Sequence, residues 1–262
     1  MKTPCSQAEK VANISFIMAL LLLLFFPTFA IIPLIFFLCC CFVAPFLPEW
    51  AFFLPIISKG QPGSKGVALT FDDGPSPETT PMILEVLERY NFKATFFVIG
   101  EKAEKYPDLI HDILAAGHSI GNHSWKHDSL LMLRSQKTLH KDIQKSQQLL
   151  SSFGFRPLLF RPPVGITNPL LKSVLEAENL ETVTFSCRAY DGGNKRVTGL
   201  AKRILGKISP GNILLLHDLP PHGAETVSAL ENELTLLFST LQKNECEVDP
   251  LEVLIGKPVM KI

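Results

Sequence analysis

Ionisable side chains follow the apolar runs of this sequence at a recurring place, the point where each run ends. A pair of aspartates, a pair of histidines and three single residues occupy these points: Asp72, Asp73, His123, His127, Arg161, Asp191 and His217. Carboxylates and imidazoles bind metal ions and transfer protons, and a guanidinium neutralises a carboxylate. These residue types therefore favour acid–base chemistry assisted by a metal ion.

His123 and His127 stand four residues apart in the sequence HSWKH. We expect a helical turn there, because this spacing places two side chains on one face of a helix, within reach of one metal ion. Taken alone, such a pair is more often a surface or core feature. Asp73 would complete an Asp/His/His set with open positions, as in catalytic zinc sites. A metal held there would polarise a carbonyl and lower the pKa of a water molecule.

The sequence DDGP at residues 72–75 has two interpretations. It has the composition of an Asx turn that closes a strand. Two adjacent carboxylates at a buried strand end also repel each other, so a metal on one and a cation near the other would compensate them. Arg161 is the candidate cation, with Asp191 as its own partner, although a surface ion pair would use the same residue types.

His217 follows the apolar residues 213–216 and precedes Asp218. The pKa of an imidazole lies near neutral pH and responds to its surroundings. His217 is therefore a candidate general acid that would protonate a departing amine.

The elements that must position these residues alternate between short β-branched runs and longer amphipathic runs. Strands are expected at residues 67–71, 94–99, 118–122, 158–161, 182–186 and 212–217, with a seventh at 251–255. Helices are expected between them, at residues 77–90, 104–116, 135–152, 168–178, 197–208 and 224–242. Such alternation predicts an α/β fold with parallel strands, as an open doubly wound sheet or a (β/α) barrel. In both folds the carboxyl ends of the strands share one face, where we expect the ionisable residues to meet.

Composition excludes several classes of protein. The 262 residues suffice for one large domain or two small ones, and no Gly-rich phosphate loop follows the first strand, which disfavours a nucleotide partner. Lys and Arg number 25, as do Asp and Glu, so no basic field indicates nucleic acid. The six cysteines form no CxxC pair and predict neither a disulfide framework nor a cysteine metal site.

The N-terminal segment is membrane-like. Between Val11 and Ile57 the only strongly polar residues are Asn13, Ser15, Thr28 and Glu49. The apolar residues 14–47 are too many for a cleaved signal peptide, and one span needs only about 20 residues. We favour a hairpin that turns near residues 27–33 and crosses the bilayer twice, over one long tilted span with an interfacial continuation. A buried core helix is disfavoured because the run has no polar face.

The chain divides into a membrane segment at residues 1–57, a polar Gly-containing linker at 58–65 and a catalytic domain at 66–262. Lys2 and Lys10 precede the apolar run, and Lys59 and Lys65 follow it. This balance predicts attachment to a membrane without fixing the side on which the domain lies.

Five segments of the chain carry a family resemblance. TFDDGP (70–75), HSWKH (123–127), RPPVG (161–165), the region of Asp191 and LLLHD (214–218) resemble, in this order, the motifs of the polysaccharide deacetylase family, the NodB-homology carbohydrate esterases. The likeness extends from about Gly66 to Ile262. It implies a distorted (β/α) barrel of about seven parallel strands, preceded here by the hydrophobic membrane segment.

The resemblance also implies metal-dependent hydrolysis of N-acetyl groups on an amino-sugar polymer such as peptidoglycan or a chitin-like chain. Departures from the family pattern, described below, add a glycolipid as a candidate substrate. Zinc is the expected metal, with cobalt, manganese and nickel as alternatives. The roles carried over by position are base for Asp72, metal ligand for Asp73, His123 and His127, orientation of base and acid for Arg161 and Asp191, acid for His217, and backbone N–H donor to the oxyanion for Val164.

The chain departs from the family pattern where a substrate would bind. Val164 stands where Tyr is usual, Phe185 and Gly192 stand where Trp is usual, and Arg188 replaces a common acidic residue. These departures leave the chemistry in place and affect the recognition of sugar rings. The alternatives are therefore a metal-dependent amidase or esterase with a non-carbohydrate substrate, and a non-catalytic carbohydrate-binding membrane protein.

Overall fold

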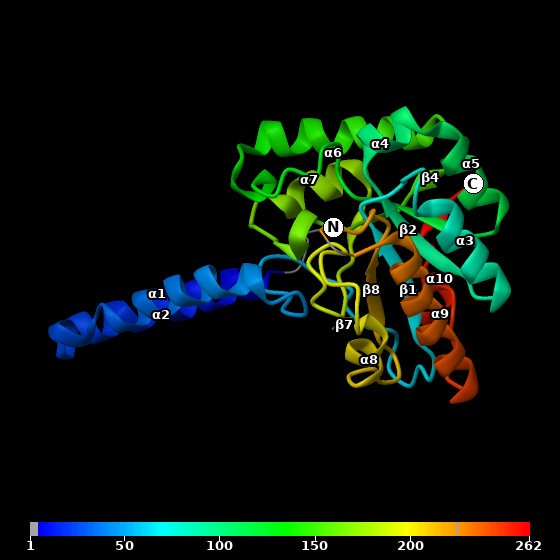
Figure 1. The fold of residues 1–262 in the computed structure, drawn as a ribbon. Coiled ribbons are helices and arrows are strands. Elements are labelled where there is room, and N and C mark those ends of the chain that lie inside the picture. The colour runs from blue at the N-terminus through cyan, green and yellow to red at the C-terminus, as the bar shows by residue number, and fades with distance from the viewer. Residues whose placement is uncertain (1–4, 224) are drawn as a thin grey trace.

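Seven parallel strands form the central sheet of the protein. The computed structural model describes residues 5–223 and 225–262 (Figure 1). The strands follow the order β6-β5-β3-β2-β1-β8-β7, and each neighbouring pair is parallel. Their bounds are β1 Ala68–Asp72, β2 Ala94–Val98, β3 Ser119–Asn122, β5 Leu159–Phe160, β6 Glu181–Thr182, β7 Cys187–Arg188 and β8 Ile213–His217. The expected parallel α/β fold is confirmed.

The connection between the two edge strands shows why the sheet is a distorted, open barrel. β6 ends at Thr182 and β7 begins at Cys187, so the intervening chain spans at most about 18 Å. In a flat sheet, strands about 4.8 Å apart would place these two edges about 29 Å apart. The sheet must therefore curl until its edges approach each other, as the resemblance implies.

Two sequence predictions about strands are wrong. Residues 182–186 do not form one strand, because Thr182 pairs with β5 and Cys187 pairs with β8 at the opposite edge. The expected seventh strand at 251–255 is the helix α10, Leu251–Ile255, whose buried side chains recur at helical spacing. α10 packs beside Ala68 and Ile213, the first residues of β1 and β8, and so lies at the end of the barrel opposite the carboxyl ends of the strands.

Helices connect and cover the strands. They are α3 Thr80–Arg89, α4 Gly100–Lys105, α5 Pro107–Ala115, α6 Gln136–Ser151, α7 Leu171–Glu178, α8 Leu200–Leu205 and α9 Val227–Lys243. The single helix expected at 104–116 is divided at Pro107, which has no N–H to continue α4 and instead begins α5. The remaining strands, β4 Arg156–Pro157 and β9 Met260–Lys261, form a separate antiparallel pair.

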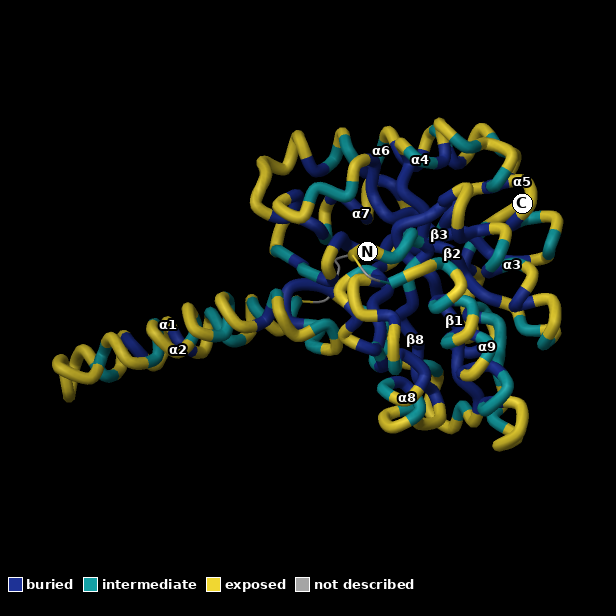
Figure 2. The backbone as a smooth tube through the Cα atoms, viewed as in Figure 1, coloured by how far each residue is buried: buried dark blue, intermediate teal, exposed yellow. Residues whose placement is uncertain are grey.

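The N-terminal residues form a helical hairpin that projects from the domain (Figure 1). α1, Gln7–Phe25, is followed by a 3₁₀ turn at Pro27–Phe29 and then by α2, Ile32–Val43, so the turn lies where the sequence predicts it. The segments Gln7–Phe25 and Pro27–Phe46 are long and apolar enough to cross a membrane. Figure 2 shows that both are mostly exposed, in contrast to the buried interior of the domain.

The base of the hairpin is joined to the domain. The Ala8 N–H donates to the Phe52 carbonyl over 2.8 Å, and the Thr184 hydroxyl donates to the Pro48 carbonyl over 2.6 Å. Ala44 and Phe52 are buried in a cluster with side chains of α6 and α7. The segment that follows the hairpin is thus packed on the barrel, and the division of the chain at residue 58 stays a prediction.

Candidate active site

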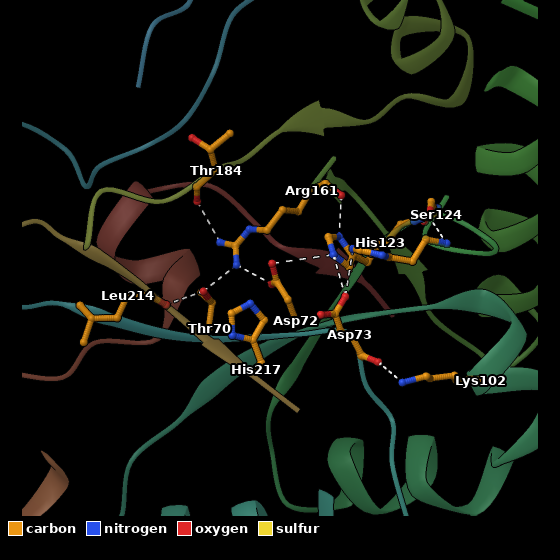
Figure 3. Close-up of polar contacts among 12 residues, drawn as sticks. Thr70, Asp72, Asp73, Lys102, His123, Ser124, Arg161, Thr184, Leu214 and His217 are labelled. Atoms are coloured by element: carbon orange, nitrogen blue, oxygen red, sulfur yellow. Dashed lines mark hydrogen bonds and ion pairs between the residues drawn. The ribbon is translucent and has the colours of Figure 1, made fainter. Parts of the chain in front are cut away.

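The ionisable residues singled out in the sequence gather at the carboxyl ends of the strands. Asp72 is the last residue of β1, His217 the last of β8, and His123 and Arg161 directly follow β3 and β5. A pocket of about 520 Å³ opens there, lined by Asp72, Asp73, His123, His127, Val164, Asp191 and His217. Arg161 is fully buried behind its wall. The topology therefore brings the candidate set to one site. Figure 3 shows Asp72, Asp73, His123, Arg161 and His217 of this set.

Asp73, His123 and His127 present three ligand atoms within 4.8 Å of one another. Asp73 Oδ1 lies 3.1 Å from His127 Nε2 and 3.4 Å from His123 Nε2. Ligands at about 2.0–2.1 Å from a tetrahedral zinc ion lie about 3.3 Å apart, so the spacing fits such an ion. Asp73 Oδ1 is buried and receives no hydrogen bond within the described residues, a deficit that a cation would remove.

The tautomer of His123 suits a metal ligand. Its Nδ1 lies 2.7 Å from the Arg161 carbonyl oxygen, which can only accept a hydrogen bond, so Nδ1 carries the proton. The lone pair of Nε2 consequently faces Asp73. Burial opposes the charged imidazolium, but the carboxylates of Asp72 and Asp73 raise the pKa of His123. Burial and the neighbouring His123 lower the pKa of His127.

The loop that carries the two histidines corrects the expected helical turn. Residues 123–127 are not helical, and Ser124 and His127 have φ angles of 70° and 53°. Asn122 Oδ1 accepts from the Ser124 N–H at 2.9 Å, and the Ser124 hydroxyl accepts from the His127 N–H at 3.0 Å. Left-handed residues and side-chain hydrogen bonds, rather than helical spacing, bring the imidazoles together.

The backbone of Asp73 is also left-handed, with φ of 72°. Lys102 Nζ donates to its carbonyl oxygen over 2.7 Å. Asp218 supports the same turn, because its N–H donates to the Asp72 carbonyl and its carboxylate accepts from Thr79 and Thr80, each at 2.6 Å. Burial raises the pKa of Asp218 to about 6, against the hydrogen bonds from the two threonines.

Asp72 is held by a guanidinium. Arg161 Nη1 donates to Asp72 Oδ1 and to the Thr70 hydroxyl, both at 2.7 Å, and Nη2 donates to the Thr184 carbonyl over 2.9 Å (Figure 3). Burial lowers the pKa of Arg161, and Asp72 opposes that effect. The expected pairing of Arg161 with Asp191 is wrong, because the structure pairs Arg161 with the base candidate instead.

Asp191 contacts His217, with Oδ2 at 2.9 Å from Nδ1. Asn194 braces both residues: its N–H donates to Asp191 Oδ2, and its side-chain amide donates to the His217 carbonyl. Burial alone lowers the pKa of His217, but the hydrogen bond and negative charge of Asp191 outweigh it, so the pKa of His217 lies above its ordinary value. The imidazolium is thereby favoured.

Val164 lies in a 3₁₀ turn at Pro163–Gly165 and has φ of 51°, which is strained for a β-branched residue. Its N–H has no hydrogen-bond acceptor within the described residues. Left-handed backbone at Asp73, Ser124, His127, Val164 and Tyr190 clusters around this pocket, as strained backbone does at functional sites.

Sequence reasoning missed several residues of the site. Lys102 acts through one hydrogen bond across the fold, and no spacing or motif marks it. Thr70 lies in the segment TFDDGP, but its hydrogen bonds to Arg161 and to the Leu214 carbonyl are made only in the fold. Lys195 and His222 line the pocket from irregular segments. Asp218 ends the segment LLLHD, but its contacts with Thr79 and Thr80 join residues far apart in the sequence.

Comparison with protein families places this geometry among known proteins. Residues 59–183 match the family model described as polysaccharide deacetylase. A peptidoglycan-N-acetylmuramic acid deacetylase of Bacillus subtilis is 33% identical over 70% of this chain, which spans only 38% of that enzyme. A peptidoglycan-N-acetylglucosamine deacetylase of Bacillus cereus is 35% identical over 63% of this chain and 78% of its own length. A chitooligosaccharide deacetylase of Bradyrhizobium is 32% identical over 72% of this chain and 90% of its own length.

Solved structures that resemble this chain come from the same family. A peptidoglycan N-acetylglucosamine deacetylase superimposes with a TM-score of 0.70 and 32% identity, over 78% of this chain and 94% of that one. A pseudoenzyme of carbohydrate esterase family 4 from Bacillus anthracis superimposes with a TM-score of 0.68 and 25% identity, over 78% and 70% of the two chains. Because an inactive protein shares the fold, the arrangement of the site residues must carry any argument for activity.

Proposed function

The chain belongs to the polysaccharide deacetylase family, and from this premise we propose that it hydrolyses the N-acetyl group of an acetylated amino sugar, in a polymer or a glycolipid. One observation carries the proposal above all others. Two differently paired groups, Asp72 with Arg161 and His217 with Asp191, line the pocket that also contains the Asp73, His123 and His127 cluster. A base and an acid beside a metal site are what amide hydrolysis requires.

Asp73, His123 and His127 would hold a divalent metal ion, for which we propose zinc. The spacing of the three ligand atoms, the proton on His123 Nδ1 and the unpaired Asp73 oxygen support this assignment. When bound, such an ion polarises a carbonyl and makes a nearby water more acidic. Cobalt, manganese and nickel prefer similar nitrogen and oxygen ligands and remain alternatives.

Asp72 is proposed as the general base. Its Oδ1 accepts a hydrogen bond from Arg161 Nη1 at 2.7 Å, which fixes the orientation of the carboxylate. The carboxylate would accept a proton from the attacking water while that water bonds to the acetamide carbon. Arg161 is fully buried outside the pocket lining and contacts Asp72, so we assign it as a positioning residue.

His217 is proposed as the general acid. Asp191 orients its ring through Nδ1 and raises its pKa, so the imidazolium would present its Nε2 proton to the departing nitrogen. The N–H of Val164 would donate to the oxyanion that forms on the former carbonyl. Cleavage of the C–N bond then gives acetate and a free amine, with water supplying the oxygen and the proton.

The substrate class follows from the relatives and from the pocket. The relatives are named for peptidoglycan and chitooligosaccharides, which are acetylated amino-sugar chains. Phe185 and Tyr190 line the pocket, and aromatic faces suit sugar rings. Tyr190 is 60% exposed, so part of its surface can contact a ligand.

We further propose that residues 14–47 anchor the protein in a membrane as a two-span hairpin, and that residues 66–262 form its catalytic domain. The two apolar helices and their large exposed side chains support the anchor. A membrane segment joined to the catalytic domain by packing would keep the active site close to the bilayer.

Release of acetate tests the proposed function. The full-length protein, purified in detergent and loaded with zinc, is assayed on peptidoglycan, chitin oligomers and acetylated glycolipids, with Asp72→Asn as the matched inactive control. We expect acetate from at least one sugar substrate with the parent only. Turnover of simple amides or esters alone would overturn the carbohydrate assignment, and binding of sugars without release of acetate would indicate a binding protein.

A further inference from the structure

The charges of the pocket are unevenly satisfied. Each of its carboxylates has a nearby partner: Asp72 contacts Arg161 at 2.7 Å, Asp191 contacts His217 at 2.9 Å, and Asp73 lies between two imidazoles. These contacts, together with the metal ion proposed at Asp73, compensate the carboxylates of this lining. The negative charges of the pocket are therefore compensated by neighbouring groups, whereas part of its positive charge is not.

Two cations of the lining have no such partner. The side chains of Arg188 and Lys195 form neither an ion pair nor a hydrogen bond within residues 5–223 and 225–262, although both line the pocket. Lys195 is exposed and Arg188 is half-buried. The N–H donors of this half-buried guanidinium are therefore available to a ligand in the pocket.

Ring contacts fix Arg188 without using its hydrogen-bond donors. Its guanidinium carbon lies 4.2 Å from the centre of the Tyr190 ring and 5.3 Å from the centre of the Phe185 ring. Lys207 Nζ lies 4.3 Å from the same Tyr190 ring and adds positive charge nearby. Stacking restricts the guanidinium plane, while its N–H donors stay free to bind two oxygens of one anion.

We propose that Arg188 and Lys195 form an anion-binding subsite that selects acetylated amino sugars bearing a carboxylate or a phosphate. The inference rests on the proposed deacetylase function and specifies its substrate. Arg188 would bind the anion through paired N–H donors, and Lys195 would add a mobile charge at the rim. Both sources of the anion share this chemistry, so the experiment has an arm for each.

The test compares four zinc-loaded full-length proteins: the parent, Arg188→Gln, Arg188→Lys and the control Arg196→Gln. The control removes an exposed charge that lies two residues after Asn194 and outside the pocket lining. Substrates are a neutral chitin oligomer, a muramic-acid oligomer with a carboxylate, and a phosphorylated N-acetylglucosamine oligomer. Arg188→Gln should lower kcat/KM about 10- to 100-fold for an anionic substrate and less than about threefold for the neutral one. Arg188→Lys should recover part of the loss.

The anionic substrate whose kcat/KM falls more in Arg188→Gln identifies the anion as a carboxylate or a phosphate. An equal loss on neutral and anionic substrates would overturn the inference, because Arg188 would then support the pocket structurally. Unchanged selectivity would also overturn it. Calorimetry of the same sugars with zinc-loaded Asp72→Asn, with and without Arg188→Gln, separates the two proposals. If anionic sugars bind more tightly and this preference depends on Arg188, but the parent releases no acetate, only the deacetylase function is refuted. If the sugars bind without that preference, the subsite is refuted.

Discussion

The pocket and the N-terminal hairpin each depart from the usual distribution of side chains. The pocket buries charged side chains, and the hairpin exposes apolar ones. In the pocket, Arg161 and Asp191 are almost completely removed from solvent, with exposures of 0% and 2%. In the hairpin, Leu24 and Phe42 are 76% and 75% exposed. Soluble domains avoid both arrangements, because charges lose hydration when buried and apolar surface orders water when exposed.

The two regions offset these unfavourable free energies in different ways. The pocket compensates its buried charges through hydrogen bonds from distant strands, and its Asp73, His123 and His127 group could hold a cation. The hairpin has hardly any internal compensation, and its side chains suit a surrounding apolar solvent. The pocket thus depends on precise partners, whereas the hairpin depends on average hydrophobicity. Single substitutions should therefore have large effects in one region and small effects on catalysis in the other.

Loss of one metal ligand should have the largest effect. His127→Ala removes one of three ligand atoms, so bound zinc and activity should both fall, the activity by at least about 10⁴-fold. Metal analysis and acetate release measure the two losses. His140→Ala, which removes a partly exposed imidazole paired with Glu178, is the control and should retain both. Full zinc occupancy with full turnover in His127→Ala would show that the ligand set is wrong.

Loss of the base or the acid should separate chemistry from metal binding. Asp72→Asn and His217→Ala should keep their zinc and each lose about 10²- to 10⁴-fold in kcat, because each removes one proton transfer. Turnover under saturating substrate, with metal content measured on the same samples, checks the result. Rates near that of the parent in both variants would rule out this acid and base pair.

Val164 distinguishes a backbone contribution from a side-chain contribution. Val164→Ala keeps the N–H and should change kcat only a few-fold, since a small wall side chain contributes about 1–3 kcal/mol at most. Val164→Pro deletes the donor and should cost about 10²- to 10³-fold in kcat. Thermal melting and metal content must match in both proteins. The oxyanion assignment fails if a folded, zinc-loaded Val164→Pro enzyme is as fast as Val164→Ala.

Asp191 should set the alkaline limit of activity. Asp191 raises the pKa of His217, and the protonated ring is the proposed acid, so activity declines as pH rises through that raised pKa. Asp191→Asn removes the negative charge and lowers the pKa of His217. The alkaline limb of kcat against pH should therefore move to lower pH. Asp108→Asn, on the exposed first turn of α5, should leave the profile unchanged. An unmoved limb in Asp191→Asn would separate Asp191 from the acid.

Charges in the hairpin should have the smallest effect on catalysis. Ile17→Asp with Phe36→Asp places a carboxylate near the middle of each candidate span, at a cost of roughly 2.5–3.5 kcal/mol per residue in a bilayer. The protein should leave the membrane fraction, while turnover of a soluble oligomer changes less than about threefold. Leu236→Asp, at a residue 52% exposed on α9, should stay in the membrane fraction. Retention of the double variant in membranes would contradict the anchor.

Cysteine labelling in intact cells tests the number of spans. Cys5 and an introduced Lys65→Cys lie before and after the apolar segment. Each is tested as the sole cysteine of the protein, with the other cysteines replaced by alanine. Two spans predict that an impermeant reagent treats both positions alike. Labelling of one position and protection of the other would establish a single crossing.

The sequence was sufficient for the features that depend on local patterns. The alternation of strand-like and helix-like runs predicted the parallel sheet, because buried parallel strands must be apolar on both faces and covered by helices. The positions of Asp72, His123 and His217 at the ends of runs predicted that they share a face, because parallel strands place all carboxyl ends on one side. The length of the apolar run predicted the hairpin.

What only the tertiary structure decided is which of these residues are partners. Composition is equally consistent with Arg161 beside Asp191 or beside Asp72, since the choice depends on which strand ends adjoin after the sheet curls. The left-handed loop that joins His123 to His127 is equally hidden, because other segments hold it in place: the Gly100 N–H donates to the Ser124 carbonyl, and the Trp125 N–H donates to Asp142 Oδ1. Residue types and their order are local properties, whereas pairing, burial and pKa arise from contacts between segments far apart in the chain.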